Sequence, residues 1–111
     1  MVPLYLLVVD IQSQDPSLPE NAFHECISPS LSHLEALQEA FGRYQIDISY
    51  HRPGELTECV GWSARAIVSI SVGRKKERAL GNLCESLVKL VQIELSELKV
   101  SGEFERYDFE G

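Results

Sequence analysis

The N-terminal run "VPLYLLVVDI" constrains the fold more than any other stretch of the sequence. Successive side chains of a strand point to opposite faces, and here both sets are apolar, with Leu4, Leu6 and Val8 on one face. A strand of this kind is covered on both sides in a folded protein. The run lacks a basic flank and reaches Asp10 too soon for a signal peptide or a membrane span, so we expect a strand and no membrane partner.

Five later segments show clear periodicity. Alternation of apolar and polar residues predicts strands over 44–50, 63–72 and 99–109. Apolar residues at helical spacing predict a helix over 29–41 and a long helix within 73–98. The strand over 44–50 is expected to be half-buried, because only one of its faces is apolar.

The start of the first helix has two alternatives. Ser28 can cap it with Pro29 at the first helical position, or Ser32 can cap it with Glu35 three residues later in a capping box. Gly42 supplies the C-terminal stop. Two prolines among polar residues predict a loop before the helix.

The order of these segments is β-α-β-β-α-β, which predicts an α+β fold with one four-stranded sheet and both helices on one face. The 111 residues are expected to form a single domain, 1–111. Because the first strand is apolar on the face that the helices leave bare, we expect a second copy of the chain to cover it. The sequence therefore predicts a homo-oligomer.

Composition narrows the partners and the compartment. The 17 acidic and 10 basic residues give a net charge of −7, so the average surface repels a phosphate backbone and nucleic acid is not expected as a partner. The three cysteines, Cys26, Cys59 and Cys84, are odd in number and widely spaced, which fits a reduced cytoplasmic protein. Because the histidines and cysteines lack metal-ligand spacing, we expect no metal and no cofactor.

Short stretches along most of the chain resemble the tautomerase superfamily, which includes 4-oxalocrotonate tautomerase, macrophage migration inhibitory factor, 5-carboxymethyl-2-hydroxymuconate isomerase and malonate semialdehyde decarboxylase. "RYQIDISYHRPGE" is similar to the second strand and turn of the decarboxylase-like branch. "SISVGRKKE" is similar to the third strand and the arginine at the start of the second helix. "LGNLCESLVKL" with "SGEFERYD" resembles the last helix and strand of the muconate isomerase, and "PLYLLVV" resembles the first strand.

This resemblance implies a βαβ repeat in a symmetric oligomer, commonly a trimer with its sheets facing the centre. It also implies that an N-terminal proline acts as a secondary amine and moves a proton between carbon and oxygen of a small keto or enol acid. An α-amine has a pKa near about 8 in peptides, and a cationic, apolar pocket lowers that pKa into the useful range. Arginines hold the substrate carboxylate and stabilise the enolate.

Carried onto this sequence, the resemblance makes Pro3 the catalytic base and Arg74 the clamp for the substrate carboxylate, with Arg52 a further candidate for the same pocket. Val2 precedes Pro3, so the proline nitrogen is a free amine only in a chain trimmed to begin there; otherwise it is an amide and not a base. Each residue also has a structural alternative. Pro3 can open a strand, Arg74 can belong to a solvated cationic group, and Arg52 can belong to a turn.

Three further interpretations concern single residues. Arg65 on the third predicted strand is expected to pair with Asp47 across the sheet, with a subunit interface as the alternative. Trp62 is either a hydrophobic plug or a pocket wall. The resemblance implies that Tyr107 and Phe109, near the C-terminal end, wrap onto a neighbouring subunit.

Two functions from different classes follow. The first is a tautomerase-like isomerase that acts on small keto-enol carboxylic acids, with either an active or a degenerate site. The alternative is a non-catalytic ferredoxin-like domain that acts by protein contact. The second function rests on a resemblance to small uncharacterised bacterial proteins that have the same element order and a tryptophan just before the third strand.

Overall fold

The structure, a computed structural model, describes residues 2–56 and 59–107. Four antiparallel strands form one sheet: β1 (Leu4–Gln12), β2 (Tyr44–His51), β3 (Ser63–Ser71) and β4 (Lys99–Tyr107). Their order in space is β2-β3-β1-β4, so β1 and β3 are central and β2 and β4 are the edges. This arrangement confirms the predicted α+β fold and its β-α-β-β-α-β order.

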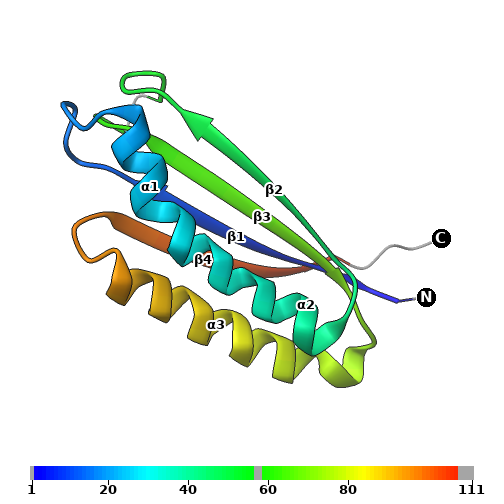
Figure 1. Ribbon diagram of the computed structural model, residues 1–111. Helices are drawn as coiled ribbons and strands as arrows, with labels where there is room; N and C mark the ends of the chain where they lie inside the picture. Colours follow the sequence, from blue (N-terminus) through cyan, green and yellow to red (C-terminus); the bar gives the residue numbers. More distant parts are fainter. Residues whose placement is uncertain (1, 57–58, 108–111) are drawn as a thin grey trace.

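The helical segments all lie on one face of the sheet, as predicted (Figure 1). The first is nearly continuous from α1 (Glu20–Leu31) through a 3-10 turn, η1 (Ser32–Glu35), into α2 (Ala36–Phe41). The second consists of a short 3-10 turn, η2 (Arg74–Lys76), followed by α3 (Glu77–Glu94). The positive φ of Gly42, +88°, ends α2 where the sequence predicts a stop.

The predicted start of the first helix is wrong, because α1 begins at Glu20 and not near residue 29. Pro19 occupies the N-cap position with extended backbone angles, so it introduces the helix instead of belonging to a long loop. Phe23 and Ile27 lie one turn apart, are fully buried and extend the apolar stripe toward the N-terminus. Burial of these two side chains offsets the cost of Pro29 inside the helix.

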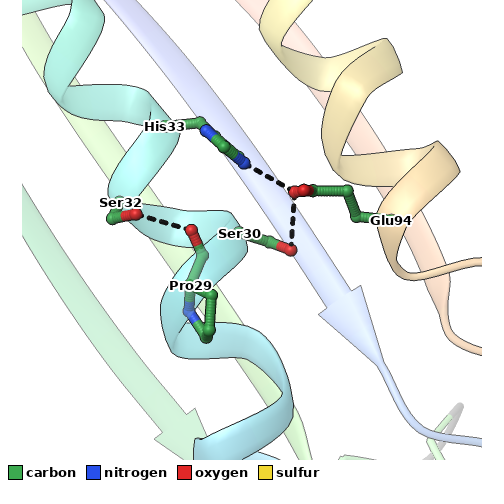
Figure 2. Close-up of polar contacts among 5 residues, drawn as sticks. All are labelled: Pro29, Ser30, Ser32, His33 and Glu94. Carbon is green, nitrogen blue, oxygen red and sulfur yellow. Dashed lines mark hydrogen bonds and ion pairs between the residues drawn. The ribbon is translucent and has the colours of Figure 1, made fainter.

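Pro29 lies near the end of α1, just before the 3-10 turn, where polar contacts link the first helical segment to α3 (Figure 2). The hydroxyl of Ser32 donates to the Pro29 carbonyl at 2.5 Å, so this serine lies at the end of α1 and does not cap a new helix. Ser30 Oγ and His33 Nε2 contact Glu94 Oε1 at 3.0 and 2.7 Å. The last turn of α3 is thereby tied to the α1–η1 junction.

The core lies between the helices and the sheet. The residues that the sequence pattern places on one face of β3 are all buried under the helices, as expected. The sequence predicts that β1 is covered on both sides, but only its helix-facing residues are buried and those of its other face are half-buried. The buried apolar side chains are Tyr5, Leu7, Val9 and Ile11 of β1; Ala64, Ala66, Val68 and Ile70 of β3, with Val72 just beyond it; Phe23, Ile27, Leu31, Leu34 and Leu37 of the first helical segment; and Leu80, Cys84, Leu87, Val91 and Leu95 of and after α3.

The opposite face of the sheet carries no helix in the described part of the chain (Figure 1). Its centre is a half-buried apolar strip made of Leu4, Leu6, Val8 and Ile67. The register places carboxylates around this strip, and they come from all strands except β3: Asp10, Asp47, Glu103 and Glu105. We call this surface the open face.

The ion pair of Arg65 differs from the predicted one. Asp10 lies directly opposite Arg65 on β1, whereas Asp47 of β2 lies opposite Ile67. Directly opposed side chains are closer than diagonal ones, so Arg65 Nε contacts Asp10 Oδ1 at 2.7 Å. The hydrogen bond and charge of Asp10 raise the pKa of the guanidinium above its ordinary value. The expected Arg65–Asp47 pair is therefore wrong.

Helix α3 approaches β4 closely at one glycine. A Cβ atom at Gly102 would lie 2.4 Å from Val88 Cγ2, closer than any ordinary contact. We expect Gly102→Ala to destabilise the protein by about 1–3 kcal/mol, because the added methyl group forces Val88 or α3 to move. Urea unfolding followed by circular dichroism measures the change.

Gly73→Ala is the matched control, because a Cβ atom there would meet no atom within 4 Å. The free energy of unfolding of this variant should stay close to that of the unaltered chain. Removing the obstructing side chain in Gly102→Ala/Val88→Ala should recover part of the loss. Equal stability of Gly102→Ala and the unaltered protein would contradict the close approach of α3 to β4.

Candidate functional site

Pro3 lies immediately before β1 and is buried. Its nitrogen is part of the peptide bond to Val2, so in this chain it has no lone pair available as a base. Its carbonyl oxygen accepts a hydrogen bond of 3.5 Å from Ser71 Oγ at the end of β3. The contact holds Pro3 in the position of a strand-opening residue.

Arg74 lies at the same end of the sheet as Pro3. Leu4 pairs with Ser71, and Arg74 follows three residues later as the first residue of η2, with its side chain exposed. At this end Arg106 Nη1 of β4 also contacts Glu77 Oε1 of α3 at 3.0 Å. The structure thus brings Pro3 and Arg74 to one end of the fold.

Arg52 lies at the opposite end. It follows His51, which pairs with Ser63 opposite Gln12, the last residue of β1. A strand rises about 3.3 Å per residue, so the nine residues of β1 separate Arg52 from Pro3 by roughly 25–30 Å. The three predicted site residues therefore do not share one pocket within a single chain.

Arg52 belongs to a closed turn. Its backbone N–H donates to Glu55 Oε2 at 2.8 Å, and the N–H of Glu55 donates to the Arg52 carbonyl at 3.1 Å. Gly54 has a φ of +82°, the left-handed region that a glycine enters without steric cost. The charged stretch after β2 thus has a backbone role.

An aromatic cluster joins α1 to the last part of β2, and the sequence reasoning missed it. The His24 ring stacks on the Tyr50 ring with centroids 4.1 Å apart, and Trp62 meets His24 edge-on at 6.5 Å. His24 lies in the N-terminal part of α1, which the sequence predicts to be a loop. Without a predicted helix there, the sequence gives no indication of which residues face β2. Trp62 is half-buried against the core and also lines a cavity beside Tyr50 and Arg52, so it has features of both the plug and the pocket wall.

A groove runs between the first helical segment and β2. Its volume is about 230 Å³, and its floor is the helix-facing side of β2: Tyr44, Ile46, Ile48 and Tyr50. Ser28, Leu31, Ser32 and Glu35 form the opposite wall. Ile48 and Tyr50 remain 40 % and 36 % exposed, so the helices cover β2 less completely than the two central strands.

The outer side of β2 is an edge of the sheet, with backbone groups that β3 does not engage. Such an edge can pair with another strand. Together the unpaired edge and the groove beside it form the surface that we call the β2 contact site, made of residues 44–51.

The cysteines do not form a reactive or metal-binding centre in the described part of the chain. Cys26 is exposed, whereas Cys59 and Cys84 are buried. Burial raises the pKa of the Cys84 thiol to about 12, so this thiol stays protonated and is a poor nucleophile. Among the described residues, no group of three histidine, cysteine or acidic side chains is placed to hold a metal ion.

Within the described residues, no helix is both long enough and apolar enough to cross a membrane.

Comparison with known proteins finds similarity in structure only. No family model matches the sequence, and no curated protein is similar to it. The chain is similar in structure to part of a protein from Burkholderia cenocepacia described as an amidohydrolase/peptidase, with a TM-score of 0.62 and 13% identity. It is also similar to part of a hydantoinase/carbamoylase family amidase from Burkholderia ambifaria, with a TM-score of 0.59 and 10% identity.

These likenesses cover 96% and 93% of this chain but only 28% and 27% of the two enzymes. The de novo designed protein Foldit4 matches over 92% of this chain and 96% of its own length, with a TM-score of 0.53 and 11% identity. A designed protein described as having a ferredoxin fold matches over 91% of this chain and 83% of its own length, with a TM-score of 0.50 and 14% identity. At these identities the likeness establishes the fold alone, which is ferredoxin-like.

Proposed function

We propose that this chain is a non-catalytic ferredoxin-like module that acts by protein contact, and that it associates with a second copy of itself through the β2 contact site. The observation that carries the proposal is the character of the β2 edge. Its eight residues, "YQIDISYH", include a single carboxylate, Asp47, and two of its large apolar side chains, Ile48 and Tyr50, are exposed. A long edge of this composition is prone to pair with another strand.

The other edge of the sheet differs in the way this proposal requires. β4 carries Lys99, Glu103, Glu105 and Arg106 among its nine residues. Charged side chains on an edge strand oppose pairing with another chain, because pairing would desolvate them or bring like charges together. The two edges of one sheet therefore have opposite tendencies, and β2 is the edge suited to contact.

The open face is a weaker candidate for self-association than β2. Two open faces stacked on each other would bring their acidic borders together, in a chain that already has a net charge of −7. The apolar strip between those borders is half-buried within one chain, so it gains less from a partner than the exposed residues of β2. We therefore place the expected self-contact at the edge and not on the face.

The sequence of β2 selects one register for two antiparallel copies. A two-fold axis perpendicular to the sheet relates the two copies, and one residue lies opposite its own copy at that axis. With Asp47 at the axis, residues 44–50 of the two strands pair; with Ile48 at the axis, residues 45–51 pair. Any other residue at the axis leaves fewer than seven strand residues paired. The axis at Asp47 sets two carboxylates directly opposite each other, which is unfavourable. The axis at Ile48 sets Ile48 against its own copy and Ile46 against Tyr50, so the apolar residues meet on the helix side.

The first test places a charge at this axis. Ile48→Lys should weaken self-association at least tenfold, equivalent to about 1.4 kcal/mol, because it sets two ammonium groups against each other. Light scattering at micromolar concentration should give twice the chain mass for the unaltered protein and the single-chain mass for the variant.

Ile93→Lys is the matched control, because Ile93 lies on α3 and, among the described residues, is the most exposed large apolar one, at 74 %. It should leave the dimer mass unchanged. A single-chain mass for the unaltered protein would contradict self-association, and a threefold mass would favour the trimer that the tautomerase resemblance implies.

The second test reads the register directly. In a background with Cys26→Ser, Ile48→Cys should form a disulfide between two copies, because directly opposed Cα atoms of antiparallel strands lie about 4.5–5.5 Å apart, within disulfide range. Asp47→Cys should form little, because its two copies lie diagonally. Non-reducing electrophoresis after mild oxidation measures the yields, and a higher yield for Asp47→Cys would contradict the Ile48-centred register.

A second candidate function, a tautomerase-like isomerase of small keto-enol acids, is favoured by one observation. Pro3 and Arg74 lie at the same end of the sheet, so a base and a carboxylate clamp would be near each other in a chain that begins at Pro3. In that chain the proline nitrogen is a secondary amine. The chain with Val2 still attached offers an amide at this position and is expected to be inactive.

An ultraviolet assay for the ketonisation of phenylenolpyruvate tests this second candidate. A chain that begins at Pro3 should show turnover that Arg74→Ala lowers at least tenfold, since the clamp on the substrate carboxylate is lost. The same chain beginning at Met1 should match the buffer rate. Turnover at the buffer rate in the Pro3 chain would exclude the enzymatic candidate and leave the contact module.

A further inference from the structure

A second cavity lies on the open face, away from the groove beside α1 and at the end of the sheet where β2 runs into the turn of Arg52. Its volume is about 230 Å³, and its lining residues are Asp10, Gln12, His51, Leu56, Ser63, Ala64 and Arg65. The strand register explains why the polar residues gather there. Ser63 is paired with Gln12 on one side and with His51 on the other, so three polar side chains stand in a row across three strands.

Arg65 lines this cavity, and its pairing with Asp10 leaves one edge of its guanidinium group unused. It binds Asp10 side-on, with Nε to Oδ1 at 2.7 Å and Nη2 to Oδ2 at 3.3 Å. This pairing uses Nε–H and one hydrogen of Nη2, and it leaves the hydrogens of Nη1 and the second hydrogen of Nη2. Of these three hydrogens, one on Nη1 and the one on Nη2 point the same way and form a second planar pair of donors, which has the geometry to hold one more carboxylate.

The hydroxyl of Ser63 is a second, independent observation at this cavity, because it is buried and lacks a hydrogen-bond partner among the described residues. The residue is only 3 % exposed, and among the described residues its Oγ has no hydrogen-bond partner. A buried hydroxyl without a partner is uncommon, because it loses its bonds to water and gains none. By the register it lies on the open-face side, between Gln12 and His51, at the floor of the cavity.

We propose that this cavity binds a small monocarboxylate, held by the free edge of Arg65 and by the hydroxyl of Ser63, with Gln12 and His51 at its sides. The cavity is smaller than drug-sized pockets, so the ligand is a metabolite of a few carbon atoms. Asp10 places a negative charge against Arg65 and also lines the cavity, so a singly charged planar group fits better than a phosphate dianion. This proposal does not depend on the β2 contact site.

The test is a titration of the isotopically labelled chain with sodium acetate, followed by amide chemical shifts at constant ionic strength. Shifts at residues 10–12, 49–51 and 63–65 should saturate together. Arg65→Lys keeps the positive charge beside Asp10 but lacks the planar pair of donors, so it should weaken acetate at least tenfold. Arg78→Gln removes an exposed charge on α3 and should leave the affinity unchanged.

Ser63→Ala separates binding from folding. Because the unpartnered hydroxyl is a cost in the empty protein, this variant should melt at a higher temperature than the unaltered chain and bind acetate at least tenfold more weakly. Inorganic phosphate should bind more weakly than acetate. Non-saturating shifts, equal affinity in Arg65→Lys, or tighter binding of phosphate would each overturn the proposal.

Discussion

The rest of the structure depends on the burial of β1 between two neighbouring strands and beneath the two helical segments that cover one face of the sheet (Figure 1). β1 pairs over its full length with β3 on one side and β4 on the other. Its helix-facing side chains Tyr5, Leu7, Val9 and Ile11 are at most 2 % exposed. Fully burying one such side chain contributes about 1.5–3 kcal/mol, so this single strand anchors much of the core.

The central position of β1 decides which surfaces remain for function. With β1 and β3 in the middle, the edges fall to β2 and β4, and the two edges have different chemistry. β4 is highly charged, whereas β2 carries one carboxylate and two exposed large apolar residues. The aromatic contact of His24 with Tyr50 holds α1 against the end of β2 and leaves a groove beside the rest of the strand. The order of the strands thus leaves β2 as the edge at which we propose contact with another chain.

Periodicity in the sequence predicts the strands and the second helix well, because burial repeats every two residues in β1 and β3 and at helical spacing in α3. The start of α1 is missed because Pro29 after Ser28 imitates a helix start, while the true start follows Pro19. Periodicity does not encode the order of the strands, so it cannot show that Asp10 of β1, and not Asp47 of β2, lies directly opposite Arg65. For the same reason, the separation of Arg52 from Pro3 and Arg74 could not be read from the sequence.

Hydrogen exchange of the backbone amides of β2 tests the central claim most directly, because pairing of two copies occupies amides that are open in a single chain. If β2 is the contact edge, exchange across residues 44–51 slows as the protein concentration rises, while exchange along β4 stays constant. Exchange along β2 that does not depend on concentration, or slowing confined to β4, would contradict the account.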